Sequence, residues 1–482
     1  NIGQLLPDTL SRLTFDNGFN RVIMPGQLPK SIRVIKFGRD FSQSLSAGAL
    51  PPSLTELFTG DGFNRTLEAD SLPSSLTSLT FGQYFNQPLN HNSLPSSIRY
   101  LTFGFDFNKP IEPGVLPYSL ITLVFGHNFN KELKPGSLPL SLISLTFGKT
   151  FNKGLEPGTL PAMLTTLICD FNAPITPRSL PRSLTYLEFG DNFDQSICVG
   201  YLPPSITFLT FGFSFNQAID EGCLPLALNT LVIGYSFNQS LKPGCLPDGL
   251  LTLDFGASFK GPLEVQVLPE TLRSLAIGAG FTQNIVFPKS IQSLILDNIS
   301  QLVYIQALPG PLDSLVVRSG DVGLTSMELN IPPMPVVPYI KHMTLNIGYG
   351  LSTQPRTLDT PVIPMRILLD NLVKSVVRRM SNVETYQMEL LALPLPITKR
   401  FTLSRHQLDF RLIDPSCILI VTHHSPMCGD FGNGNEGGNG SGDGDVDDDI
   451  LPKFRMIHGP YHKLRNRNVY IDAMCAAINK LF

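Results

Sequence analysis

The chain has 482 residues, of which 42% are apolar and 16% charged, and its formal net charge is −3. Its 40 glycines and 41 prolines argue against a mainly helical protein, because proline breaks the interior of a helix. The near-neutral charge gives no electrostatic reason to expect nucleic acid or an anionic membrane as a partner, and no apolar run approaches the ~18 residues of a membrane-spanning helix.

A Leu-Pro pair recurs along the first part of the chain at a nearly constant interval. The interval is 22 residues, apart from one 20-residue step after Leu160 and two irregular steps near the end. The pairs begin at Leu6, Leu28, Leu50, Leu72, Leu94, Leu116, Leu138, Leu160, Leu180, Leu202, Leu224, Leu246, Leu268, Phe287 and Leu308. Such a fixed period indicates a solenoid in which each repeat forms one coil.

Each repeat predicts one short strand. In the segment from Leu76 to Phe81, apolar and polar residues alternate at the end, as in a strand with one buried face. Gly82 follows at once and is expected to let the chain turn out of the strand. The other half of the coil carries up to three prolines, which excludes a helix and leaves turns or a short 3₁₀ segment. A Pro-Gly pair there, as in Pro113-Gly114, suits a type II turn.

A second phenylalanine follows the strand in every coil and predicts an aromatic column in the core. These residues are Phe19, Phe41, Phe63, Phe85, Phe107, Phe129, Phe151, Phe171, Phe193, Phe215, Phe237, Phe259 and Phe281. The next residue is Asn in nine of these thirteen coils, and its amide is expected to satisfy backbone groups of the bend from the inside. The fold class is therefore an all-β-rich solenoid, a leucine-rich-repeat-like stack with a parallel sheet on one side.

The segments 85–89, 107–111 and 171–175 resemble the FNIP repeat, a family found in social amoebae and in giant viruses of amoebae. The resemblance covers roughly residues 1–310. It implies a leucine-rich-repeat-like solenoid that serves as a protein-interaction scaffold inside the cell. Relatives join such repeats to an F-box or a kinase domain, and this chain contains neither. Ser42, Asp194, Lys260 and Thr282 replace the repeat's Asn, so the resemblance weakens toward the C-terminal coils.

The sequence divides into four segments. We expect the repeat solenoid over residues 1–318, and degenerate coils with a small mixed α/β C-terminal cap over 319–427. Residues 428–449 hold eight Gly, seven acids and no Lys or Arg, which is typical of a disordered linker. Residues 450–482 carry six Lys or Arg against one Asp and form a basic segment.

Within these segments, apolar spacing predicts helices over 365–380 and 471–481, and strands at 401–403 and 417–421. Asn1 falls in the middle of a coil. We expect missing sequence or another chain to cover that end, since an uncapped solenoid exposes apolar core.

No motif predicts a catalytic centre, a metal or a cofactor. Residues 432–437 match G-x-G-x-x-G inside low-complexity sequence without the flanking strand and helix that this fingerprint needs. The histidines and Cys428 near the C-terminus lack the spacing of a zinc site.

Seven cysteines suggest a reducing compartment, although Cys223 and Cys245 occupy one repeat position on adjacent coils, as a disulfide would require. We expect both to be thiols. Asn64 and Asn238 lie in glycosylation sequons but are expected to be buried.

The outward residues of the strands are the candidate partner-binding site. Most are small or Thr, and a few large or charged residues interrupt these columns. Tyr186 and Phe208 share one column on neighbouring coils, and Phe213 and Tyr235 form a similar pair just past the strand. The remaining candidates are Lys36, Phe58, Glu188 and Asp254. Clustered exposed aromatic residues are typical of interaction hot spots, and the alternative is ordinary stacking of neighbouring side chains.

We therefore expect a non-enzymatic, cytoplasmic scaffold that binds a protein on its strand-bearing face, without a cofactor. The alternative is a targeting module of a larger protein, such as an F-box adaptor or a kinase. The Thr columns suggest an ice- or surface-binding solenoid, but Lys36, Glu188 and Asp254 interrupt the flat array that such a surface needs.

Overall fold

A computed structural model describes residues 6–264, 266–298, 301, 304–305, 310–318, 339–348, 383–392, 404–414, 417–426 and 454–458. The chain forms two compact units, Asn1–Pro269 and Glu270–Phe482, here called unit 1 and unit 2. Side chains are described as far as Thr344.

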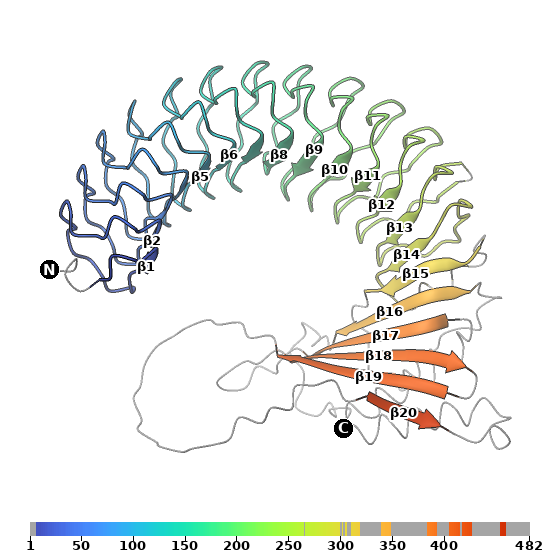
Figure 1. The fold of residues 1–482 in the computed structure, drawn as a ribbon. Helices are drawn as coiled ribbons and strands as arrows, with labels where there is room; N and C mark the ends of the chain where they lie inside the picture. Colours follow the sequence, from blue (N-terminus) through green and yellow to red (C-terminus); the bar gives the residue numbers. More distant parts are fainter. Residues whose placement is uncertain are drawn as a thin grey trace, which may run out of the picture. The chain divides into compact units, whose positions relative to one another are not determined.

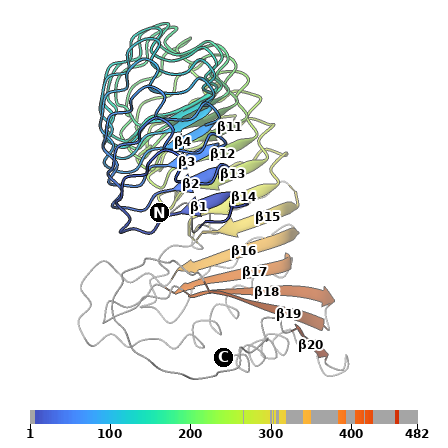
Figure 2. The same cartoon turned by 60° about the vertical axis from the view of Figure 1, so that its left-hand side comes forward.

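Unit 1 is a stack of coils, each contributing one short strand to a parallel ladder. Neighbouring strands pair without any shift in register, so that equivalent repeat positions face each other, as Leu79 faces Leu101. The strands lie side by side along the inner side of an arc (Figures 1 and 2). Their bounds are β1 (Arg12–Thr14), β2 (Val34–Lys36), β3 (Glu56–Phe58), β4 (Ser78–Thr80), β5 (Tyr100–Thr102), β6 (Thr122–Val124), β7 (Ser144–Thr146), β8 (Thr166–Cys169), β9 (Tyr186–Phe189), β10 (Phe208–Thr210), β11 (Thr230–Val232) and β12 (Thr252–Asp254).

Turns close the rest of each coil, and the predicted absence of helix there is confirmed. After each Leu-Pro pair a backbone hydrogen bond closes one turn, as from the Leu76 N–H to the Pro73 carbonyl at 3.0 Å. The Pro-Gly turn closes between the Val115 N–H and the Glu112 carbonyl at 3.3 Å. Gly114 in that turn has a φ of +79°, as a type II turn demands of its third residue.

A glycine follows every strand of unit 1 except β1 and β8, and its role differs from the one expected. Gly60 alone among these glycines has a positive φ, of +75°. Gly82, Gly104 and Gly126 do not adopt a positive φ, so a tight turn does not require them. Instead, a Cβ built on Gly126 would clash with the carbonyl oxygen of Gly104, and one on Gly104 with the carbonyl of Gly82. Adjacent coils approach each other backbone to backbone at this point, which only glycine permits.

Two phenylalanine columns fill the core behind the strands, and the predicted one, farther from the strands, is confirmed. Thr59, Cys169 and Ile233 interrupt the column nearer the strands. Rings of the column nearer the strands are 5.6 Å apart between Phe81 and Phe103, and rings of the farther column are 6.0 Å apart between Phe85 and Phe107. The strands themselves are about 4.8 Å apart. Each coil is therefore thinner on its strand side, which makes that side concave.

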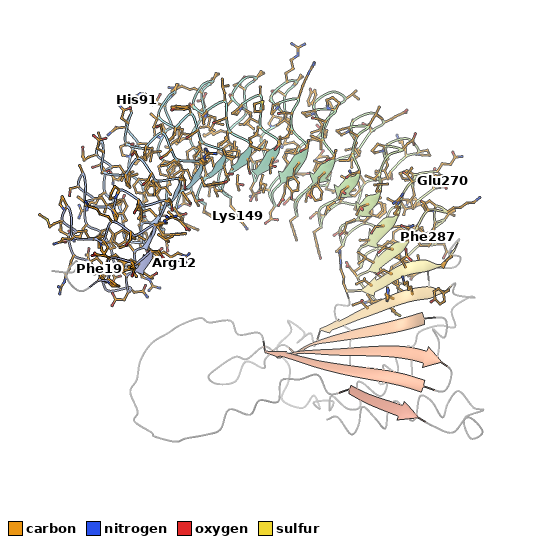
Figure 3. The ribbon with its side chains drawn as sticks, viewed as in Figure 1. Arg12, Phe19, His91, Lys149, Glu270 and Phe287 are labelled. Atoms are coloured by element: carbon orange, nitrogen blue, oxygen red, sulfur yellow. The ribbon has the colours of Figure 1, made fainter. Side chains whose placement is uncertain are left out.

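Side chains of unit 1 extend from both sides of the arc (Figure 3). His91 lies on the convex side and Lys149 extends toward the concave side (Figure 3). We call the edges of the concave face the N-terminal rim, where the strands begin, and the C-terminal rim, where they end.

The coil of β8 is irregular because it is two residues shorter than its neighbours. Cys169 replaces the phenylalanine of the inner column, the one nearer the strands, and is fully buried. Phe171 fills the vacated space by turning edge-on, at 83° to Phe151 and 88° to Phe193. The Lys149 ammonium and the Asp191 carboxylate, on the two flanking coils, meet at 3.5 Å across the shortened loop.

Unit 2 begins with a parallel ladder and continues as an antiparallel one. Strands β13 to β17 pair in parallel and β17 to β20 pair antiparallel. The predicted strand at 417–421 is confirmed within β19. The predicted strand at 401–403, both predicted helices and the acidic linker lie outside the described residues. The strands are β13 (Ser274–Ile277), β14 (Ser293–Leu296), β15 (Leu312–Val317), β16 (Ile340–Gly348), β17 (Val383–Ala392), β18 (Ser404–Asp414), β19 (Cys417–Pro426) and β20 (Phe454–His458).

Candidate functional site

The concave face of unit 1 presents two outward columns per strand against a buried central residue. The middle residue of each three-residue strand from β2 onward is buried, and its two neighbours are half-buried or exposed. Of the 22 outward positions in β2 to β12, Thr and Ser occupy ten and Val or Ile four, so the eight aromatic and charged residues are distinct local features of this face.

Tyr186 and Phe208 stack on this face as the first aromatic pair. Their ring centroids are 4.5 Å apart at an angle of 7°, and β9 and β10 hold them opposite each other in register. The Tyr186 hydroxyl donates a hydrogen bond of 2.7 Å to the Glu188 carboxylate. Burial and this hydrogen bond raise the pKa of Tyr186 to about 12, which keeps the phenol protonated as a donor.

Phe213 and Tyr235 form the second aromatic pair, on the C-terminal rim. Their ring centroids are 4.6 Å apart at 4°, and each side chain is 52% exposed. The same rim position holds Phe105, which stacks on His127 at 4.3 Å and was not among the predicted site residues. Tyr100, exposed in the column of the first pair, was also missed. Comparing repeat positions across all coils would have identified both.

Lys36 and Phe58 meet near the other end of unit 1. The Lys36 ammonium lies 4.3 Å from the centre of the Phe58 ring, in a cation–π contact. Both line a groove of about 560 Å³ along the strand ends, together with Phe105 and Asp61. Asp61 is also 4.0 Å from the Arg39 guanidinium. This groove combines a cation, a carboxylate and four phenylalanine rings, of which those of Phe58 and Phe105 are not buried.

The eight predicted residues thus lie in separate clusters on one face. From β3 to β9 the ladder has six spacings of about 4.8 Å, so Phe58 and Tyr186 are about 29 Å apart. Asp254 stands in the column of Lys36 and Glu188 on β12, opposite Val232. In the structure Tyr186 contacts Phe208 and Glu188. Phe213 contacts Tyr235, and Lys36 contacts Phe58.

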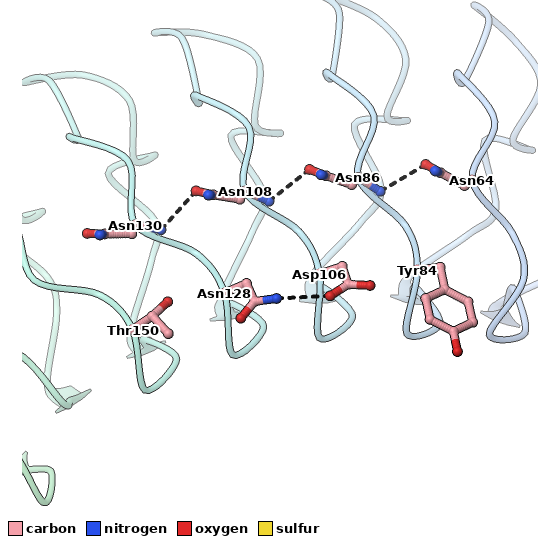
Figure 4. A pocket seen from close by; sticks show the side chains of 8 residues that line it. All are labelled: Asn64, Tyr84, Asn86, Asp106, Asn108, Asn128, Asn130 and Thr150. Carbon is pink, nitrogen blue, oxygen red and sulfur yellow. Dashed lines mark hydrogen bonds between the residues drawn. The ribbon is translucent and has the colours of Figure 1, made fainter.

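A second groove, of about 670 Å³, runs beside the asparagine column (Figure 4). The Asn86 N–H donates to the Asn64 Oδ1, and the Asn108 N–H to the Asn86 Oδ1, each at 3.0 Å. Asp194 continues the ladder by accepting the Asn216 N–H at 2.9 Å. The asparagine side chains accept hydrogen bonds from backbone N–H groups, as predicted. The prediction that they lie inside the bend is wrong. Asn64 and Asn238 are exposed rather than buried, because the amide bonds to the next coil from the solvent side.

Cysteine and metal chemistry find little support in the described part of the chain. Cys223 and Cys245 are buried free thiols, and burial raises the pKa of each. Among the described residues, no cluster of three or more His, Cys, Asp or Glu side chains could hold a metal ion. Within the same residues, no helix has the length and apolar character needed to cross a bilayer.

Comparison with known proteins agrees with the repeat architecture. The crystal structure of CroV588, described as a novel circular LRR protein, is similar to this chain at 36% identity and a TM-score of 0.51. The similarity covers 71% of this chain and 57% of that protein, so this chain spans little more than half of its length. No curated protein matches the chain.

The FNIP Repeat family matches in eight segments, some of which overlap, and these are 3–38, 19–62, 63–106, 107–150, 129–169, 171–214, 215–257 and 237–280. These matches cover more than half of the chain and follow the coils of unit 1. The chain belongs to the FNIP repeat family and has its leucine-rich-repeat-like solenoid fold.

Proposed function

We propose that unit 1 is a protein-interaction scaffold without catalytic activity, whose partner lies along the concave strand face. The distribution of the large side chains supports this proposal best. Clusters about 29 Å apart exceed the reach of one small molecule, whereas a protein partner can cover them together.

The first aromatic pair is the best anchor for such a partner. Stacked rings provide a large contact area at a low cost in side-chain entropy, and aromatic residues are enriched among interface hot spots. Glu188 fixes the Tyr186 hydroxyl through the 2.7 Å hydrogen bond and leaves a carboxylate beside the rings. A partner with an apolar group next to a basic one would match this arrangement.

Replacing Tyr186 and Phe208 together with alanine is expected to weaken partner capture at least about tenfold. Thermal stability should change little, because the two rings lie half-buried on the surface and pack mainly on each other. The measurement is quantitative pull-down from an extract of the source cells, with thermal melting in parallel.

The matched control is Thr122→Ala with Thr252→Ala, which changes two residues of the same column that do not adjoin the pair. This control should recover the same partners as the unmodified chain. Equal recovery of every partner by the Tyr186 and Phe208 variant would rule out this pair as the anchor.

A further inference from the structure

An exposed apolar stripe runs along the N-terminal rim of unit 1, apart from the concave clusters. Tyr118 and Leu140 occupy one repeat position on successive coils, and each is 77% exposed. On the next coil Met163, one residue further along, is 63% exposed, and Ile143 adds a partly exposed side chain between them. The stripe therefore crosses the coils of β6, β7 and β8 without interruption.

The repeat loses a stabilising hydrogen bond where the stripe crosses the coil of β8. In neighbouring coils a serine at the position of Met163 donates to a carbonyl of the preceding coil. Ser119, Ser141 and Ser183 do so at 2.7, 2.7 and 2.6 Å. Met163 supplies no such donor and instead places an apolar side chain in solvent. Ala227 and Gly249 also lack this serine, but of the three positions only Met163 places a large apolar side chain in solvent, and a local rule broken without structural gain is typical of a functional position.

Charge at the two ends of the stripe indicates the partner. The rim segments 96–99, 118–121, 140–143, 162–165 and 182–185 contain two charged residues, Arg99 and Arg182, and no Asp or Glu. Both arginines are exposed, and neither pairs with a carboxylate in the part of the chain that the structure describes. An apolar stripe between two unpaired guanidinium groups complements a segment that has carboxylates at both ends.

The spacing of the stripe matches a helix. One step from coil to coil is between about 4.8 Å at the strands and 6.0 Å at the outer phenylalanine column. One turn of an α-helix rises about 5.4 Å, so apolar residues at i, i+4 and i+7 advance one coil at a time. From β5 to β9 the four spacings amount to about 19 Å, which about 13 helical residues span.

We propose that the N-terminal rim from Arg99 to Arg182 binds an acidic amphipathic helix of a partner protein. Three apolar residues of that helix lie on Tyr118, Leu140 and Met163. Carboxylates in its first and last turns pair with the two arginines. This surface is independent of the concave aromatic pairs, so the two proposals can fail separately.

The test is fluorescence anisotropy of the full chain with a designed peptide of about 15 residues. The peptide carries leucines at i, i+4 and i+7 and glutamates in both end turns. A second peptide has lysines in place of the glutamates, and a third has a proline between the leucines. We expect the first peptide to bind and the other two to bind at least about tenfold more weakly.

On the protein, Leu140→Ser with Met163→Ser should weaken binding of the first peptide at least about tenfold. This variant should fold as the unmodified chain does, since Met163→Ser restores the repeat's own serine. The matched control is Leu226→Ser. Leu226 occupies the repeat position of Leu140, three coils beyond β8, and is 84% exposed. This variant should bind the first peptide as the unmodified chain does.

The proposal is overturned if the acidic peptide does not bind, if the lysine peptide binds as well, or if Leu226→Ser weakens binding equally. Equal binding of the proline peptide would exclude a helical partner. A second copy of the chain is the competing occupant. Sedimentation would identify it as a dimer that the Leu140 and Met163 variant separates, and that result would also overturn the proposal.

Discussion

Replacing Gly126 with alanine is expected to disrupt the stacking of coils in unit 1 and to destabilise the fold by at least about 4 kcal/mol. The added Cβ would collide with the Gly104 carbonyl carbon and oxygen, which belong to the backbone of the preceding coil. No side-chain rotation relieves such a contact, so two coils must separate and the strand pairing beside them must distort. Urea unfolding followed by circular dichroism measures the loss.

Gly154→Ala is the matched control, because a Cβ at Gly154 meets nothing within 4 Å and its φ is not positive. We expect its unfolding midpoint to stay within the error of the unmodified chain, or to rise slightly. A Gly126→Ala variant that unfolds at the same urea concentration as Gly154→Ala would contradict the close approach of the coils.

Phe107→Ala is expected to cost about 3–5 kcal/mol, the usual range for a fully buried phenylalanine. The Phe107 ring has no exposed surface and stacks at 6.0 Å on Phe85 and on Phe129. It also lies 3.8 Å from the Phe103 ring of its own coil. Its removal leaves a cavity that the stacked neighbours cannot close without moving whole coils. Thermal and urea unfolding report the difference.

Phe105→Ala, two residues earlier in the same coil, provides the comparison. Phe105 is 47% exposed and stacks on His127 alone, so we expect a loss below about 1 kcal/mol. Similar losses for the two variants would mean that the outer phenylalanine column does not carry the core.

The sequence was sufficient to predict the strands, the core column and the bonding of the asparagine ladder. These features repeat more than ten times, so one residue pattern constrains every coil and local irregularities do not obscure it. The reason for the glycine after each strand was not predictable. A glycine can relieve a positive φ or a close backbone approach, and only the distance between coils distinguishes the two.

The exposure of the asparagines was missed for a similar reason. An amide oxygen can accept a backbone N–H from inside or outside the bend, and the sequence pattern is the same in both cases. The apolar stripe was missed because Tyr118 and Leu140 occupy a variable position of the repeat, directly after the Leu-Pro pair. Their exposure follows from the turn after Leu-Pro, which directs that position into solvent, and the spacing of the pairs does not reveal it.

The unequal spacing of the two phenylalanine columns also has a mechanical consequence. Opening the arc would compress the stacked rings and stretch the strand hydrogen bonds, and closing it would press the strands together, so unit 1 resists bending through every intact coil. Thr59, Cys169 and Ile233 replace the inner ring in the coils of β3, β8 and β11, and only in the coil of β8 does Phe171 also stand edge-on, so the stacking that resists bending is weakest in the β8 coil. We expect elastic deformation to concentrate in the coil of β8, which is close to both the first aromatic pair and the end of the apolar stripe. A force applied to one of these two surfaces should therefore also displace the other.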